Sequence, residues 1–264
     1  MPLSWIVWPF PELMAFGFAL PRMLAIFSVL PMFNRQALPG MLRIGVAGGL
    51  ALFLVPGLID PAMAVERGTG EIIAICFKEA LIGFLLGFII AMPIWAFEVM
   101  GAFVDNQRGA SIAQTLNPLT GHESSPLGDL FSQTIVVLLF ITGGFTLILA
   151  AIQDSYRLWP VLSFFPDLDA STPAFLLSQL DRMMRLAIVM SAPIMFAMLL
   201  AEIGLAIVSR FVPQLQVFFL AMPIKSGIAI FMFSIYVAVL FDYSIDAVRN
   251  IGALTLQQLT TIFR

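Results

Sequence analysis

The sequence predicts an all-α integral membrane protein made of kinked helical hairpins, and three observations support this class. Hydrophobic residues make up 60% of the 264 residues and charged residues only 11%, whereas a soluble domain has about 25% charged residues. The mean hydropathy is +1.00. Apolar stretches of helix length follow one another along the chain. One soluble core could not cover so much apolar surface, and we expect a single domain over residues 1–264.

About six long hydrophobic segments are candidates for membrane helices, because about 20 mostly apolar residues span the hydrocarbon layer. Turn residues separate most of them, with Arg35 and Pro39 after the first, Gly and Pro residues between 56 and 70, and an acidic stretch at 160–173. The segments are Leu13–Phe33, Met41–Leu58, Ile72–Val104, Leu127–Trp159, Pro173–Val212 and Gln214–Phe241.

The two ends of the chain carry further signals. The first residues lack the basic region and the small-residue cleavage site of a signal peptide, so we expect the first hydrophobic segment to be retained. In the tail Asp242–Arg264, apolar residues recur at near-helical spacing. This spacing predicts a C-terminal amphipathic helix that lies on a membrane surface or against a partner. Lys and Arg do not alternate between the connecting segments, which leaves the orientation open.

Proline and glycine recur inside the apolar segments. Proline removes a helical hydrogen bond and bends the axis, while small residues let helices approach closely. We therefore expect kinked helices in tightly packed hairpins. The residues concerned are Pro93, Pro193, Pro213 and Pro223, with the glycine pairs Gly83/Gly87 and Gly143/Gly144.

Charged residues also occur inside several segments, where each would cost on the order of 2.5–3.5 kcal/mol at a bilayer centre. Each should therefore face a protein partner or water, and those near segment ends are expected to extend toward water. Glu98 and Glu202 lie deeper, and their side chains are short. Each could relay protons, pair with Arg or Lys of a neighbouring subunit, or stay protonated in the core. We favour the pairing role.

Composition and motifs argue against several function classes. A net charge of −3 without a basic cluster argues against nucleic acid as a partner. Cys76 is the only cysteine, so no intrachain disulfide can form. His122 is the only histidine, and no HExxH, CxxC, GxSxG or phosphate-binding motif is present. We therefore expect no enzyme activity, no catalytic residue, no metal and no cofactor, and we interpret His122 as part of a polar loop.

A polar segment, Asp105–Gly128, lies between the two longest charge-free runs, Ala80–Phe97 and Leu130–Gln153. Irregular backbone near hydrocarbon is tolerated only inside protein or beside a wet cavity. Asp105 and Arg108 can pair on one helical turn, and Ser124-Ser125-Pro126 can cap the next helix. A plain solvent loop and a movable constriction both fit this composition, and we favour the constriction.

Four stretches carry a family resemblance: KEALIGFLLGF at 78–88, WAFEVMGAFVDNQRGAS at 95–111, NPLTGHESSPLG at 117–128 and SRFVPQLQVFFLAMPIKSG at 209–227. They resemble the T component of the type III secretion export apparatus, the SctT family that includes YscT and SpaR, whose flagellar counterpart is FliR. The QRGA and SPLG forms look more like the injectisome branch than the flagellar one.

The resemblance implies a gate subunit of the bacterial inner membrane, through which unfolded secretion substrates pass. It implies assembly with the R and S components in a helical gate raised partly toward the periplasm. Further expected partners are the U and V components, inner rod or needle subunits and membrane lipids. Within the family, a loop of the T component plugs the closed channel, which implies the same role here for about Gln107–Ser125.

The residues that we carry over for the plug are Gln107, Arg108, Gly109, Ser111, Asn117, Pro118, Gly121 and Ser125. Those expected to act in assembly or as buried polar groups are Glu98, Asp105, Glu202, Pro213, Gln214, Pro223 and Lys225. Two alternatives stay open. One is a flagellar FliR-type gate subunit, and the other is a stand-alone proton- or solute-coupled transporter that uses Glu98 and Glu202.

Overall fold

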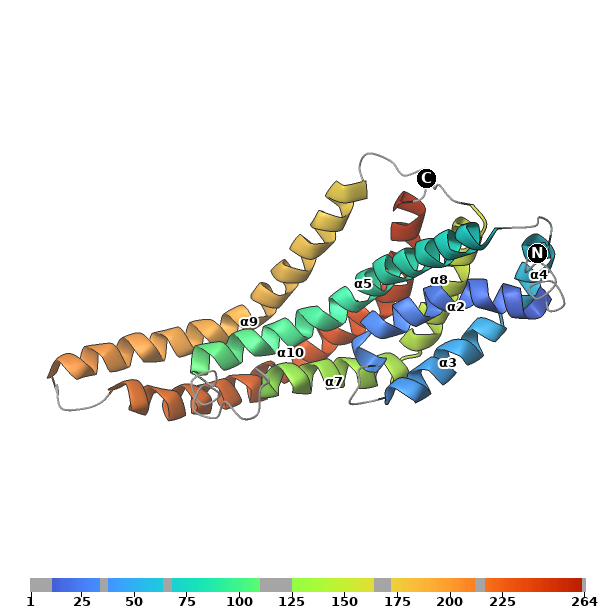
Figure 1. Cartoon of the computed structure of the whole chain (residues 1–264). Helices are drawn as coiled ribbons and strands as arrows, with labels where there is room; N and C mark the ends of the chain where they lie inside the picture. Colours follow the sequence, from blue (N-terminus) through green and yellow to red (C-terminus); the bar gives the residue numbers. More distant parts are fainter. Residues whose placement is uncertain are drawn as a thin grey trace. The chain divides into compact units, whose positions relative to one another are not determined.

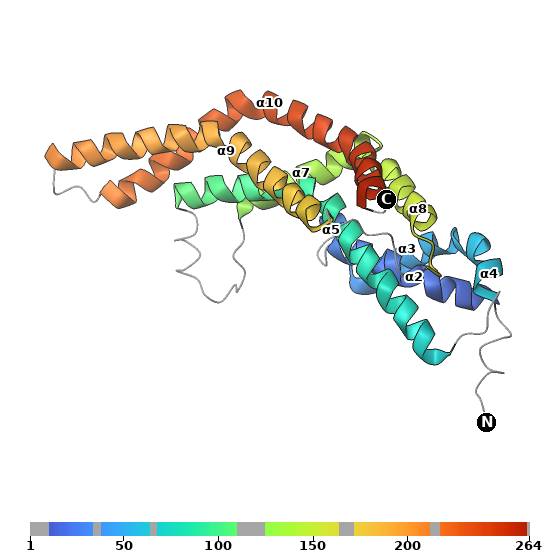
Figure 2. The same ribbon diagram turned by 90° about the horizontal axis from the view of Figure 1, so that it is seen from above.

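A computed structural model describes residues 11–33, 38–63, 68–109, 125–163, 172–211 and 217–262, and these residues form helices without any strand. Figures 1 and 2 show the helices from two directions. In chain order they are α2 (Pro11–Val29), the 3-10 turn η1 (Pro31–Phe33), α3 (Gly40–Leu52), α4 (Val55–Met63), α5 (Thr69–Arg108), α7 (Pro126–Ile141), α8 (Gly144–Leu158), α9 (Thr172–Phe211) and α10 (Val217–Ile262). The predicted all-α class is confirmed.

The chain divides into two compact units, with α5 passing from the first to the second at Met92 and Pro93. The first unit holds α2, α3, α4, the first part of α5 and α8. Its core is built on α2, where Phe18, Met23 and Phe27 are buried at helical spacing. The Phe27 ring stacks on Phe33 of η1 with the centroids 4.3 Å apart.

Two glycines explain how closely α5 approaches α2 in the first unit. A Cβ on Gly83 would collide with the backbone of Arg22, and one on Gly87 would lie 3.1 Å from the Ile26 backbone. Absence of both side chains lets the two backbones pack in direct contact, as small residues do in membrane helix pairs. This approach brings the polar side chains of α2 and α5 together.

The second unit contains the remainder of α5, with α7 and most of α9 and α10. Its buried core joins Val104 of α5, Ile194 and Met198 of α9, and Ala229 of α10. In Figures 1 and 2 the last part of α9 runs alongside the first part of α10, as expected for a helical hairpin. Three helices therefore share one apolar seam.

The count of six long segments is slightly off. Among the described residues, four helices are long and apolar enough to cross a membrane, or up to five if α7 and α8 form one broken span. The segment predicted at 41–58 is not one helix, because it divides into α3 and α4 of 13 and 9 residues. Pro56 accounts for the break, since its ring would clash with the Leu52 carbonyl in a continuous helix.

The tail is a continuation of α10 and not a separate helix, since α10 runs unbroken over 46 residues. Its amphipathic character stays a prediction, because the side chains beyond Asp246 lie outside the described part of the chain. In contrast, α7 and α8 do separate, at Thr142 and Gly143, where Gly143 has a φ of 77° that favours glycine.

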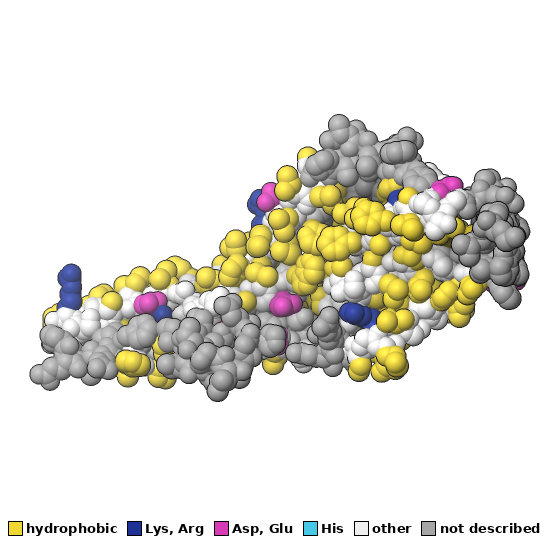
Figure 3. Space-filling model, viewed as in Figure 1, with side chains coloured by type: hydrophobic (Ala, Val, Ile, Leu, Met, Phe, Trp, Pro, Cys, Tyr) yellow, Lys and Arg dark blue, Asp and Glu magenta, His cyan; other side chains and the backbone are white. Residues whose placement is uncertain are grey.

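Much of the apolar surface is uncovered in the isolated chain. On the face shown in Figure 3, hydrophobic side chains cover most of the described surface and charges are few. Only 28% of the most apolar window of α9 and 17% of that of α10 are buried. A surface of this kind requires lipid or protein neighbours. The chain is thus a multi-pass membrane protein.

Candidate functional site

The candidate site lies in the second unit, where α5 ends and α7 begins. Asp105 is 2% exposed and accepts two hydrogen bonds from the other side of the gap, from the Ser125 hydroxyl at 2.6 Å and the Leu127 amide at 2.9 Å. Ser125 also accepts from the Gly128 amide at 3.0 Å, so it is the N-cap of α7 as predicted. We call Asp105, Ser125, Leu127 and Gly128 the neck.

The backbones of α5 and α7 touch directly beside the neck. A Cβ on Gly101 would lie 2.5 Å from the Gly128 amide nitrogen, and one on Gly128 would lie 2.9 Å from the Glu98 carbonyl oxygen. Side chains at these two positions would force the helices apart. The neck therefore combines charge-assisted hydrogen bonds with a crossing that only glycine permits.

Arg108 adds a cation to the neck from the last turn of α5. One of its terminal nitrogens lies 2.7 Å from Asp105 Oδ1, as the spacing of three residues indicates. The pair is ionic and lacks hydrogen-bond geometry, because Asp105 Oδ1 and Arg108 Nε are both buried without a hydrogen-bond partner. Gly109 then ends the helix with a φ of 88°. Arg108 thus keeps hydrogen-bonding capacity where residues 110–124 begin.

Lys225 ties α10 to the same end of α5. Its Nζ lies 2.7 Å from Glu202 Oε2 on α9 and donates to the Gln107 carbonyl at 3.3 Å. Lys225 is 8% exposed, whereas the Glu202 side chain is 49% exposed. A cation at a helix C-terminus is favourable, because the last carbonyl groups carry partial negative charge. Lys225 therefore links three helices at the base of the neck.

The other residues named from the sequence fall in different places. Glu98 is half-buried near Ser132 and Asp129 of α7. Pro223 is exposed on α10, two residues before Lys225. The plug residues Ser111, Asn117, Pro118 and Gly121, together with Pro213 and Gln214, lie outside the described residues.

A second polar cluster, in the first unit, was missed by sequence reasoning. Arg22 and Glu79 are both 0% exposed, and the guanidinium donates to the two carboxylate oxygens at 2.6 and 3.0 Å. The Arg22 guanidinium also donates to Ser155 Oγ and to the Trp159 carbonyl. Arg22, in the middle of the first predicted segment, thus faces a partner inside the protein and not water. A separation of 57 residues between the partners left no local signal for this pair.

Lys78 belongs to this cluster and fixes the turn that follows α8. Its Nζ lies 2.8 Å from Glu79 Oε1 and donates to the carbonyls of Val161 and Ser163 at 2.5 and 2.9 Å. Among the described residues, no group of three His, Cys, Asp or Glu side chains could hold a metal ion. The contacts of Arg22, Glu79 and Lys78 hold α2, α5 and the turn after α8 together.

Comparison with known proteins places the chain in a family. The profile described as "Bacterial export proteins, family 1" matches residues 13–251. "Yop proteins translocation protein T" of Yersinia pestis is 42% identical over 226 residues, which cover 85% of this chain and 86% of that protein.

Two further relatives extend the comparison to other systems. "Surface presentation of antigens protein SpaR" of Shigella flexneri is 31% identical over 80% of both chains. "Flagellar biosynthetic protein FliR" of Bacillus subtilis is 31% identical over 94% of both chains. The resemblance found in the motifs is confirmed. The chain belongs to the bacterial export protein family, as a non-enzymatic SctT-type component of the type III secretion export apparatus that is homologous to FliR.

Proposed function

We propose that the chain is a gate subunit through which unfolded substrates of a type III secretion system cross the inner membrane, and that residues 107–125 plug the closed passage. The observation that carries the plug is the neck. Asp105 binds Ser125 and Leu127, so both ends of the segment 110–124 are anchored at one point. A segment anchored in this way can change conformation without separating α5 from α7.

The amino-acid composition of the segment supports the same role. Residues 107–125 contain Gly109, Gly121 and the Asn117-Pro118 pair, which favour turns over helix. They carry no long apolar run that would insert into lipid. A polar segment next to a wet passage avoids the cost of burying unpaired backbone in hydrocarbon.

Assembly with the R and S components is supported by helix length and exposure. α9 has 40 residues, so its length measured along the bent helix axis is about 60 Å, roughly twice the thickness of the hydrocarbon layer. Apolar side chains are exposed at both ends of this helix, for example Leu177 at 65% and Phe211 at 81%. The part of such a helix that lies beyond the bilayer would need protein neighbours to cover its apolar side chains. This requirement is consistent with an assembly raised toward the periplasm. We extend the proposal to the U and V components and to rod or needle subunits.

A stand-alone transporter that uses Glu98 and Glu202 has less support. Lys225 of the same chain lies 2.7 Å from Glu202, and a carboxylate paired with a cation is poorly suited to a proton relay. Pairing of Glu98 or Glu202 with a neighbouring subunit stays a prediction. Purification separates the two functions, because a transporter would keep its activity alone. A gate subunit would be stable chiefly together with its R and S partners.

The plug is tested by replacing residues 110–124 with a short Gly/Ser linker that leaves the neck intact. Leakage of a small fluorescent solute through the assembled complex is then measured in proteoliposomes. We expect the shortened segment to raise leakage severalfold, because the passage loses its seal. The matched control replaces residues 164–170, which precede α9, with a linker of equal length. Leakage that stays at the wild-type level after the 110–124 replacement would refute the plug.

A further inference from the structure

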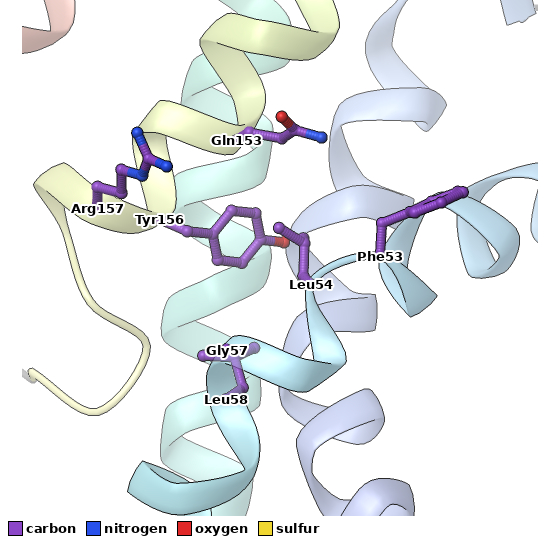
Figure 4. A pocket seen from close by; sticks show the side chains of 7 residues that line it. All are labelled: Phe53, Leu54, Gly57, Leu58, Gln153, Tyr156 and Arg157. Carbon is purple, nitrogen blue, oxygen red and sulfur yellow. The ribbon is translucent and has the colours of Figure 1, made fainter.

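A cavity of about 340 Å³ opens in the first unit between α8 and the turn that joins α3 to α4. A volume of this size is within the range of small-molecule sites. Phe53, Leu54, Gly57 and Leu58 line it on one side, and Gln153, Tyr156 and Arg157 line it on the other. Figure 4 shows the Tyr156 ring extending from α8 toward Leu54, with Gln153 about one turn away on the same helix. The cavity therefore has an apolar side and a polar side.

The Tyr156 side chain is fixed by the buried cluster behind it. Its hydroxyl donates to the Ala19 carbonyl at 2.9 Å, and the Arg22 guanidinium lies 4.0 Å from the ring centroid. Arg22 is in turn held by Glu79. The ring is thus preformed as one wall of the cavity, and a ligand would not have to order it.

Arg157 supplies an available cation at the edge of the cavity. Its side chain is 86% exposed, and in the described part of the chain its one ion-pair contact is with Asp154 at 3.4 Å. Guanidinium has five N–H donors and matches the oxygens of a phosphate. Gln153 lies four residues earlier on α8, so its amide is on the same helix face. Arg157 can therefore bind an anionic head group at the edge of the cavity.

Apolar side chains are also exposed at Phe53 and along α3, which precedes the cavity in the chain. Phe53 is 77% exposed, and on α3 Met41, Leu42 and Ile44 are 87%, 58% and 55% exposed. α3 has 13 residues, which is too short to cross a hydrocarbon layer that needs about 20. A short apolar helix of this kind fits the boundary between acyl chains and head groups. An amphiphile from the bilayer can therefore reach the cavity.

We propose that this cavity binds an anionic phospholipid, with one acyl chain against Phe53, Leu54 and Leu58 and the phosphate on Arg157. The ligand joins the α3–α4 turn to α8 on the outer side of the buried cluster. Gly57 lines the cavity, and a Cβ at this position would meet nothing within 4 Å, so a larger side chain can be introduced there without a clash. This role is independent of the plug proposed for residues 107–125.

The test uses the full chain in mild detergent and native mass spectrometry. Phosphatidylglycerol and phosphatidylcholine with identical acyl chains are added in equal amounts. We expect phosphatidylglycerol to be retained about tenfold more strongly, the difference that one charge-assisted contact typically gives. Arg157→Gln should remove this preference, and Gly57→Leu, which fills the cavity, should lower retention of both lipids.

Arg185→Gln is the matched control, because it removes the same charge from an exposed position on α9. It should leave the lipid preference unchanged. Equal retention of the two lipids by the wild type, or an unchanged preference in Arg157→Gln, would overturn the proposal. A loss in Arg185→Gln as large as that in Arg157→Gln would also overturn it, since binding would then follow net charge alone. Displacement by millimolar glycerol phosphate would assign the site to a soluble anion instead.

Discussion

Substitution of Gly101 by alanine tests whether the crossing of α5 and α7 holds the neck together. The new Cβ would lie 2.5 Å from the Gly128 nitrogen and 2.6 Å from both the Gly128 Cα and the Leu127 carbonyl carbon. All three are backbone atoms, so no side-chain rotation can relieve the contact. Ordinary contacts of a Cβ begin at 3.4 Å, so the helices must separate by roughly 1 Å.

The size of the effect follows from three contributions. Overpacking costs about 1–3 kcal/mol. Stretching the hydrogen bond from the Leu127 amide to Asp105, now 2.9 Å long, costs about 1 kcal/mol more. Alanine favours helix over glycine by about 1 kcal/mol, which offsets part of the loss. We expect a net destabilisation of about 2 kcal/mol, or a melting temperature lower by about 4–8 °C.

The assay is thermal unfolding of the purified chain in detergent, with Gly204→Ala on α9 as the matched control. A Cβ on Gly204 meets nothing within 4 Å, so this variant should melt at or slightly above the wild-type temperature. A Gly101→Ala variant that melts as high as Gly204→Ala would refute the close crossing. The destabilised variant should also leak more solute in the assembled complex.

Three further predictions concern the two polar clusters. Glu79→Gln leaves the Arg22 charge buried without a counter-ion. We expect the free energy of unfolding, measured by chemical denaturation, to fall by about 3–5 kcal/mol. A fall of less than about 1 kcal/mol would contradict a charged buried pair. Lys225→Met should speed hydrogen exchange in the last turn of α5, because the Gln107 carbonyl loses its donor and the turn frays. Lys225→Arg can still donate to that carbonyl and should preserve the protection. Equal exchange in both variants would argue against the link. Ser125→Ala should lower the free energy of unfolding by about 1–2 kcal/mol, because α7 loses its cap and the buried Asp105 carboxylate loses one donor. An unchanged melting curve would show that the cap is dispensable.

Fold class and segment order could be predicted because both depend on local signals. Apolar runs bounded by turn residues located α5, α9 and the start of α7. The division of 41–58 could not be seen from hydropathy, since Pro56 and Gly57 stand inside an apolar stretch. Their effect depends on whether the backbone before the proline can remain helical, which is a property of the packed structure.

The candidate site was predictable in part. The contact between Asp105 and Arg108 and the Ser125 cap follow from spacings of a few residues. The bond from Ser125 to Asp105 and the pair of Arg22 with Glu79 join residues 20 and 57 positions apart. Whether residues so far apart in the sequence meet depends on which helices pack together.

The most direct test of the plug is a photo-crosslinking residue placed at Asn117 in the assembled export complex. A secretion substrate with a stably folded domain at its end is used to stall transport. We predict that the label at Asn117 crosslinks to the stalled substrate, and that the same label at Met41, exposed on α3, does not. Complexes that hold the substrate but yield no crosslink from Asn117 would contradict a plug formed by residues 107–125.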